Sequence, residues 1–234
     1  MKAVILAGGL GTRLSEETKS KPKPMIKIGG KPILWHIMMI YSTYGINDFV
    51  VCCGYKGEII KEYFENIPEK WNVELVDTGL NTMTGGRIKR IEKYVHDQTF
   101  CLSYGDDLKS VDITELVNFH KKRKKLATIT ITKPNPRFGI VKVKEDDLIN
   151  MGEKSKQDEN WINGGYFVLE PEIFDYITGD DSVWEIEPMK KLVEDNQISA
   201  FKYNGKYYPM DTAQDKMKLE EMWKTNNAYW KVWK

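Results

Sequence analysis

Three glycines and two cations near the start of the chain have the spacing of a phosphate-binding loop. Residues 8–11 read Gly-Gly-Leu-Gly after an apolar run, and Arg13 and Lys23 follow. Glycines let a backbone approach a phosphate closely and point successive amide groups at its oxygens. The two cations would neutralise the phosphate charge. The Gly-Lys-Ser/Thr of a Walker loop is absent, and Leu14 replaces the last glycine of the dinucleotide fingerprint. We therefore expect a different nucleotide-binding loop after a first strand.

Further motifs follow in order along the chain. They are Gly-Gly-Leu-Gly-Thr-Arg at 8–13, Pro-Lys-Pro-Met at 22–25, Asp-Thr-Gly at 77–79, Thr-Gly-Gly-Arg at 84–87, Arg-Phe-Gly at 137–139, Ile-Asn-Gly-Gly-Tyr-Phe-Val-Leu-Glu-Pro at 162–171 and Pro-Met-Asp-Thr at 209–212. Together they resemble the sugar-phosphate nucleotidyltransferases (nucleoside-diphosphate-sugar pyrophosphorylases), and among them the glucose-1-phosphate cytidylyltransferases. The resemblance covers nearly the whole chain. It implies an enzyme that transfers CMP from CTP to glucose 1-phosphate, releases pyrophosphate and makes a CDP-activated building block for surface polysaccharides.

Size and charge exclude several other classes of protein. The 234 residues, of which 41% are hydrophobic, suffice for one large α/β core. With 35 Lys and Arg against 34 Asp and Glu, no global charge recruits nucleic acid or an anionic membrane. The basic run at 121–125 is expected at a helix end, facing water. The expected partners are CTP and a phosphorylated small-molecule acceptor, together with further copies of the chain in a homo-oligomer.

The cysteines and the start of the chain indicate a cytoplasmic protein. Cys52 and Cys53 are adjacent in an apolar run and point to opposite faces of a strand, so they cannot easily pair with each other. Together with Cys101 they are expected to be reduced core residues. The chain begins directly with a core strand, which leaves no room for a signal peptide, and no apolar stretch is long enough to span a membrane.

Short apolar runs alternate with amphipathic stretches in the first half, which predicts a Rossmann-like three-layer α/β/α fold with a mostly parallel sheet. The resemblance places this fold in the nucleotidyltransferase (glycosyltransferase-A-like) type. Strands are expected at Ala3–Leu6, Phe49–Cys53, Val73–Val76, Phe100–Ser103 and Ala127–Ile131, and helices at Ile33–Tyr44, Lys56–Glu65, Arg87–Tyr94 and Ile113–Lys124. Because ligands bind beyond the carboxyl ends of parallel strands, residues 8–13 and 105–106 should share one cleft.

The whole chain, 1–234, is expected to form one nucleotidyltransferase domain. Residues 1–133 are its nucleotide-binding half, and residues 134–234 an acceptor-binding and C-terminal elaboration that completes the cleft. Strands are expected at Phe138–Val143, Trp161–Leu169 and Ser199–Tyr203, and a last helix from near Asp211 through Trp223. The aromatic tail at 229–233 either packs on its own domain or forms a subunit contact.

The reaction that the resemblance implies brings two polyanions together, so it needs a metal, cations and amides more than an acid or base. The resemblance assigns Asp106 and Asp211 to one Mg²⁺, and gives Arg13 and Lys23 catalytic roles on the phosphates. The plainer alternatives are a turn residue for Asp106, a helix N-cap for Asp211 and solvated surface charges for the two cations.

The resemblance also implies two sets of binding residues. Those for the nucleotide are Leu6, Ala7, Gly8, Gly9, Gly11, Thr12, Arg13, Lys23, Thr78, Thr84, Gly85, Gly86 and Asp106; Thr78, Thr84 and the two following glycines would read the cytosine. Those for the acceptor are Tyr104, Arg137, Gly139, Glu153, Lys154, Asn163 and Gly164. The plainer alternatives are a glycine turn before a helix for residues 84–86 and a solvated charged loop for residues 153–154.

Three departures from the family pattern concern the acceptor side or the assembly. Asp107 replaces the second glycine of Gly-Asp-Gly, Ser155 replaces the proline of Glu-Lys-Pro, and residues 66–71 stand where a longer stretch is usual. These changes keep open a cytidylyltransferase that acts on a smaller polyol phosphate, such as glycerol phosphate, and put the usual oligomer in question. A non-catalytic nucleotide-sensing homologue is a further alternative, although Arg13, Lys23 and the carboxylates are all present.

Overall fold

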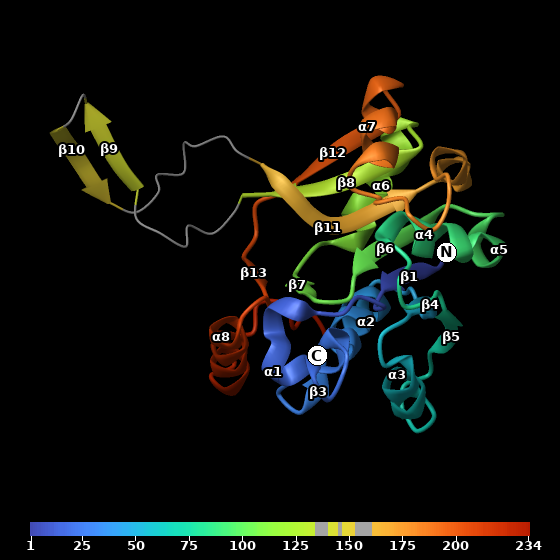
Figure 1. Ribbon diagram of the computed structural model, residues 1–234, viewed down its shortest axis with the longest axis horizontal. Coiled ribbons are helices and arrows are strands. Elements are labelled where there is room, and N and C mark those ends of the chain that lie inside the picture. The colour runs from blue at the N-terminus through green and yellow to red at the C-terminus, as the bar shows by residue number, and fades with distance from the viewer. Residues whose placement is uncertain (134–139, 145–146, 153–160) are drawn as a thin grey trace.

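A seven-stranded sheet forms the centre of the computed structural model, which describes residues 1–133, 140–144, 147–152 and 161–234 (Figure 1). The strand order is β12–β8–β11–β6–β1–β4–β5. Their bounds are β1 (Ala3–Leu6), β4 (Asp48–Cys53), β5 (Asn72–Asp77), β6 (Phe100–Tyr104), β8 (Ala127–Thr132), β11 (Ile162–Leu169) and β12 (Ile198–Tyr203). Of these seven strands, β11 alone runs antiparallel to its neighbours. The predicted mostly parallel sheet is therefore confirmed.

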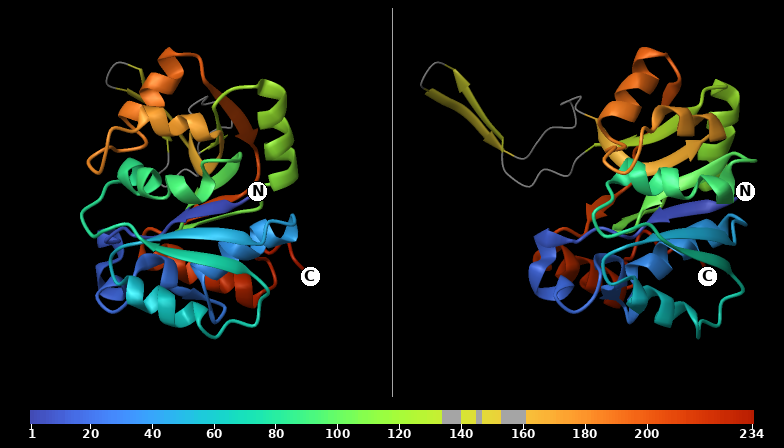
Figure 2. Two further views of the ribbon diagram at one scale, coloured as in Figure 1. Left: turned by 90° about the vertical axis from the view of Figure 1, so that its right-hand side faces the viewer. Right: turned by 45° about the vertical axis from the view of Figure 1, so that its right-hand side comes forward.

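Helices lie on both faces of this sheet (Figure 2). They are α1 (Ser15–Thr18), α2 (Ile33–Thr43), α3 (Gly57–Phe64), α4 (Thr84–Arg90), α5 (Glu92–Val95), α6 (Ile113–Arg123), α7 (Glu187–Glu194) and α8 (Ala213–Lys224), with short 3-10 helices at Thr12–Leu14, Lys23–Met25 and Pro171–Tyr176. Three small pairs accompany them: β2 (Lys27–Ile28) with β3 (Lys31–Pro32), β7 (Asp107–Lys109) with β13 (Tyr207–Pro209), and β9 (Ile140–Lys144) with β10 (Asp147–Gly152). None of the described helices combines the length and apolar character that a membrane crossing requires.

The apolar strands are buried on both sides, which divides the core in two. Along β1, Ala3 and Ile5 pack with α2, α3 and α8, whereas Val4 and Leu6 pack with α4, α5 and α7. Cys53 belongs to the first cluster and Cys52 to the second, and both are buried free thiols. This confirms the prediction that they occupy opposite faces of a strand. It is also the pattern of a parallel sheet covered by helices on both sides.

Helix ends follow local chemistry where the sequence supplies it. Helix α2 stops before Gly45, whose φ of 81° suits glycine. Helix α8 begins after Thr212, which forms a reciprocal capping box with Asp215. Thr212, rather than Asp211, is thus the N-cap, and this removes the plainer alternative for Asp211.

The helix predicted over Arg87–Tyr94 differs from the observed one. Helix α4 begins three residues earlier, at Thr84, and ends at Arg90, while α5 continues after a break at Ile91. The early start is possible because the carbonyl of Ser182, from a distant segment, accepts hydrogen bonds from the first amides of the helix. Such amides lack partners inside a helix, so a tertiary contact decided this boundary.

The aromatic tail packs on its own chain. Trp230 is fully buried, and its indole Nε1 donates a hydrogen bond to Nδ1 of His36 on α2 at 3.3 Å. The rings of Trp223, Trp230 and Trp233 all lie within about 6 Å of the His36 ring. The other imidazole nitrogen, Nε2, donates to the carbonyl of Ile28 at 2.8 Å. The tail therefore fastens α8 to α2 through a neutral, fully buried histidine.

This histidine predicts acid sensitivity of the fold. Burial lowers the pKa of His36 from 6.5 to about 4. A depressed folded-state pKa means that the stabilisation is complete above about pH 6.5 and is lost as the pH falls toward 4, since the unfolded chain takes up the proton first. We expect the loss to be about 3 kcal/mol. Urea unfolding at pH 7 and pH 4.5 measures it. A His36→Gln variant should show a smaller difference between the two pH values, and an equal difference would contradict the assignment.

Candidate functional site

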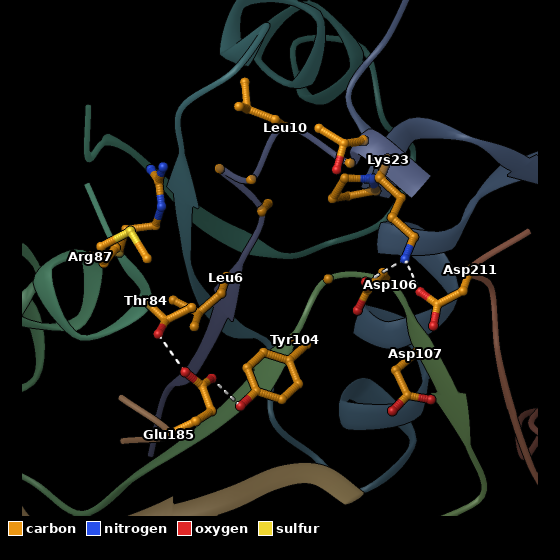
Figure 3. A pocket seen from close by; sticks show the side chains of 18 of the residues that line it. Leu6, Leu10, Lys23, Thr84, Arg87, Tyr104, Asp106, Asp107, Glu185 and Asp211 are labelled. Atoms are coloured by element: carbon orange, nitrogen blue, oxygen red, sulfur yellow. Dashed lines mark hydrogen bonds and ion pairs between the residues drawn. The ribbon is translucent and has the colours of Figure 1, made fainter. Parts of the chain in front are cut away.

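A cavity of about 900 Å³ lies beyond the carboxyl ends of β1 and β6 (Figure 3). Its lining includes both segments that were predicted to share a cleft, the loop after β1 and the Gly105-Asp106 turn after β6. Residues from the second half of the chain complete the wall: Asn163, Glu185, Tyr207, Pro209 and Asp211. The cavity is therefore placed where the sheet topology predicts a ligand, and both halves of the sequence contribute to it.

The glycine loop after β1 is shaped by close contacts that only glycines allow. Gly11 has a φ of +64°, a conformation that side chains disfavour. A Cβ on Gly8 would lie 2.2 Å from Nη1 of Arg87, so the guanidinium occupies the space beside the bare Cα. The exposed Gly9 has open space around it. The loop thus presents uncovered backbone to the cavity, as close approach of a phosphate requires.

Three charged groups meet on one side of the cavity. Nζ of Lys23 donates to Oδ2 of Asp106 at 2.7 Å and to Oδ1 of Asp211 at 2.8 Å (Figure 3). Lys23 is buried and stiffened by the prolines on either side, while the two carboxylates are half-buried. Burial by itself would lower the pKa of Lys23, but the charges and hydrogen bonds of the two carboxylates outweigh it and raise that pKa. The lysine is therefore a fixed cation, and the solvated alternative is wrong.

Arg87 lies on the opposite side of the glycine loop. It is buried, and its Nη1 donates to Oγ1 of Thr78 at 2.8 Å and to the carbonyl of Gly79 at 2.7 Å, while Nη2 donates to the carbonyl of Leu80 at 3.2 Å. These bonds connect the 78–80 loop to the guanidinium that lies against Gly8. Arg87 itself lines the cavity, whereas the fully buried Thr78 does not.

A hydrogen-bonded chain of polar side chains forms the wall opposite Lys23. Asn163 donates from Nδ2 to the Tyr104 hydroxyl at 3.0 Å, and Tyr104 donates a short bond to Oε1 of Glu185. Thr84 donates to Oε2 of Glu185 at 2.6 Å. Burial, followed by the charge of Glu185, raises the pKa of Tyr104. The phenol therefore stays protonated and continues to donate to the carboxylate.

Asp107 and Lys109 form a buried ion pair beside the metal-binding candidate Asp106. Lys109 is fully buried; Nζ donates to Oδ2 of Asp107 and lies 3.8 Å from the centre of the Tyr207 ring. The other carboxylate oxygen of Asp107, Oδ1, is buried without a hydrogen-bond partner. Burial raises the pKa of Asp107 to about 6, despite the opposing charge of Lys109, and lowers the pKa of Lys109. Asp107, which replaces the glycine usual in the family, is therefore paired with a buried counter-ion, Lys109.

The structure brings most of the predicted site residues together. Those that line the cavity are Leu6, Ala7, Gly8, Gly9, Gly11, Thr12, Lys23, Thr84, Tyr104, Asp106, Asn163 and Asp211. Those that do not line it are Thr78, Gly85, Gly86 and Gly164. Arg137, Gly139, Glu153 and Lys154 lie outside the described residues, as do Ser155 and the side chain of Arg13.

Among the lining residues that the sequence analysis did not assign to the site are two whose charged side chains bear on binding, Arg87 and Glu185. Arg87 could have been found, because it directly follows the Thr-Gly-Gly motif. Glu185 carries no comparable signal: it is one of several acidic residues in the stretch 180–187, and nothing in their order marks the one that faces a ligand.

Comparisons with known proteins show which sequences and structures this chain resembles. A model of the nucleotidyl transferases matches residues 2–231. Over the full length of both chains, the sequence is 49% identical to a glucose-1-phosphate cytidylyltransferase of Salmonella typhimurium and 40% identical to a probable glucose-1-phosphate cytidylyltransferase of Bacillus subtilis. A crystal structure of HddC from Yersinia pseudotuberculosis complexed with GMP-PN superimposes with a TM-score of 0.75 at 26% identity, covering 95% of this chain and 99% of that one.

The Asp107–Lys109 pair predicts strong coupling between two residues. We expect Asp107→Asn to lower the free energy of unfolding by about 3–5 kcal/mol, because it leaves the Lys109 ammonium buried without a carboxylate. The double variant Asp107→Asn/Lys109→Met should be closer to the wild type, since both buried charges are gone. Urea unfolding of the four proteins in this mutant cycle measures the coupling, and a double variant no more stable than the Asp107→Asn variant would contradict it.

Proposed function

The chain belongs to the nucleotidyl transferase family, and we propose that it is a cytidylyltransferase that transfers CMP from CTP to glucose 1-phosphate and releases pyrophosphate. The observation that carries the proposal is the contact of Lys23 with Asp106 and Asp211 beside the glycine loop. It combines a fixed cation, two carboxylates and bare backbone amides in one cavity, which suits the joining of two phosphate-bearing reactants. The full-length relatives favour CTP and glucose 1-phosphate as these reactants.

The chemistry follows from the charges of the reactants. An oxygen of the acceptor phosphate attacks the α-phosphorus of CTP, a new P–O bond forms, and the bond to the β-phosphate breaks as pyrophosphate leaves. The attacking oxygen is already anionic, so no side chain has to remove a proton from it. The glycine loop binds the leaving phosphates through its amides. Lys23 reduces the repulsion between the reactants at the transferring phosphate, and Arg13 serves the β- and γ-phosphates in this proposal.

Asp106 and Asp211 fit a Mg²⁺ ion. Both carboxylates already converge on one cation, the Lys23 ammonium, and oxygen ligands suit this metal. Within the described residues, no set of three or more His, Cys, Asp and Glu side chains gathers into a closed metal site. A two-carboxylate site agrees with Mg²⁺, which retains waters and binds substrate phosphates. When bound, the ion would neutralise charge on the phosphates of both reactants.

Arg87 is our candidate for recognition of the base. A guanidinium has five N–H donors, and Arg87 bonds to residues 53 and 78–80 through Nη1 and Nη2. Cytosine presents two neighbouring acceptors, N3 and O2, whereas uracil has an N–H donor at position 3. The edge of the guanidinium that includes Nε carries two N–H donors. These two donors could bind N3 and O2 of cytosine together, which would favour cytosine over uracil. Thr78 then acts indirectly, by holding the guanidinium.

The acceptor side of the cavity faces the Lys23 cluster. Tyr104 and Asn163 line the cavity opposite Lys23, where the sugar of the acceptor would extend from its phosphate. Glu153 and Lys154 remain proposed ligands of the sugar hydroxyls and the acceptor phosphate, and Arg137 and Gly139 remain proposed members of the same side. A homo-oligomer also stays a proposal.

Pyrophosphate release with Mg²⁺ tests the substrates directly. Each of the four common nucleoside triphosphates is combined with glucose 1-phosphate, other sugar 1-phosphates, glycerol phosphate and further polyol phosphates. We expect turnover with CTP and glucose 1-phosphate, because Arg87 is proposed to favour cytosine and the full-length relatives favour this acceptor. Turnover of CTP only with a polyol phosphate would replace the acceptor in the proposal. Binding of CTP with no release of pyrophosphate for any acceptor would contradict the proposed reaction.

The charged cluster predicts which residues the reaction needs. We expect Asp106→Asn and Asp211→Asn each to lower kcat by at least about 100-fold, because each replaces a charged ligand of the ion that offsets phosphate charge by a weaker, neutral one. Asp97→Asn, an exposed change away from the cavity, is the matched control. Circular dichroism and unfolding curves check that the variants fold. Near-normal turnover of either cluster variant would make the metal assignment wrong.

A further inference from the structure

The glycines of the Thr-Gly-Gly motif pack against a distant segment rather than lining the cavity. The amides of Gly85 and Gly86 both donate to the carbonyl of Ser182, at 2.8 and 3.2 Å. A Cβ on Gly85 would lie 2.7 Å from the Ser182 carbonyl oxygen, and one on Gly86 would lie 2.5 Å from that of Asp180. A side chain at either glycine would therefore block the packing of residues 180–185. The two amides already donate to Ser182, so they are not available to a ligand.

The docked segment holds Glu185 in one position. Trp184 next to it is fully buried against Phe167, with a ring separation of 6.0 Å. The Trp184 amide donates to Oγ1 of Thr84 at 2.9 Å, and the same hydroxyl donates to Oε2 of Glu185 at 2.6 Å. The Tyr104 hydroxyl donates to Oε1. An exposed glutamate is thus oriented by two hydroxyls from two other elements, α4 and β6, at the wall of the cavity.

The charge of Glu185 limits what it can bind. A carboxylate accepts about four hydrogen bonds, and the two described hydroxyls use only part of this capacity. It would repel a phosphate, so among the groups of the proposed substrates it suits the neutral ones that donate hydrogen bonds. Figure 3 shows the Tyr104 ring between Glu185 and the Lys23–Asp106–Asp211 cluster. A sugar whose phosphate lies at that cluster would extend along the ring toward Glu185.

We propose that Glu185 binds a hydroxyl group of the acceptor sugar, and that the Thr-Gly-Gly motif is a positioning element for this glutamate. The inference rests on the proposed function and adds to it a residue that selects the acceptor. The acceptor sugar is favoured over the ribose of the nucleotide because Tyr104 connects Glu185 to Asn163 on β11, which is separated from β1 and its glycine loop by β6. Ribose binding is the competing outcome of the test.

The Glu185→Gln variant tests this role. Its amide nitrogen cannot accept a bond, so we expect the KM of glucose 1-phosphate to rise about tenfold or more, while the KM of CTP stays within about twofold. Glu187→Gln, an exposed change two residues away that does not line the cavity, is the matched control. A rise confined to the KM of CTP would indicate ribose or base binding, and it would overturn the proposal, as would an equal rise for both substrates.

Deoxy analogues distinguish the loss of a direct contact between Glu185 and a sugar hydroxyl from a general disturbance of the site. The wild type is assayed with glucose 1-phosphates that each lack one hydroxyl at carbon 2, 3, 4 or 6. We expect one analogue to lose about tenfold or more in kcat/KM, and this loss to disappear in Glu185→Gln, because the partner of that hydroxyl is already gone. Thr84→Val should weaken the same selectivity without abolishing it. An unchanged loss in Glu185→Gln would overturn the proposal.

Different results would contradict the proposed function and the proposed role of Glu185. Turnover of CTP with glucose 1-phosphate by the wild type decides the proposed function without any variant. If the wild type uses another phosphorylated acceptor, the proposed function fails, and the same KM comparison on that acceptor still decides the role of Glu185. No turnover with any acceptor overturns both.

Discussion

The ammonium of Lys23, held between Asp106 and Asp211, is the contact on which the rest of the site depends. It joins three parts of the chain: the segment after the glycine loop, the turn after β6 and the residue before the N-cap of α8. Two carboxylates brought this close would repel each other without a cation between them. The fold therefore has to deliver all three charges together, and the same arrangement prepares the position of a divalent ion.

Placing Asp211 there requires the C-terminal part of the chain to be fastened firmly. Thr212 caps α8 directly after Asp211, and α8 is joined to α2 through the buried aromatic cluster around His36 and Trp230. The tail thus contributes to the site from a distance, because it fixes the helix that follows a charged site residue. Stability and function are connected through this packing.

On the side of the cavity opposite Lys23, glycines allow segments of the chain to pack closely against one another. Gly8 makes room for the guanidinium of Arg87, and Gly85 and Gly86 make room for the segment that carries Glu185. At Gly8 the bare Cα leaves room for a charged side chain, and at Gly85 and Gly86 it leaves room for the backbone of Ser182 and Asp180. The glycine motifs of this chain therefore act partly on the ligand and partly on the residues that contact it.

The sequence by itself determined the layered α/β fold, the strands β1, β4 and β6, the cleft at their carboxyl ends and the residues Lys23, Asp106 and Asp211. The fold, the strands and the cleft follow from local periodicity, whereas the three charged residues follow from ordered motifs that resemble those of the nucleotidyltransferases. Only the tertiary structure decided that α4 begins at Thr84, that Gly85 and Gly86 face residues 180–185, and that Glu185 enters the wall. The reason is physical: these features depend on hydrogen bonds and contacts between segments about a hundred residues apart, and no local pattern in either segment specifies its partner.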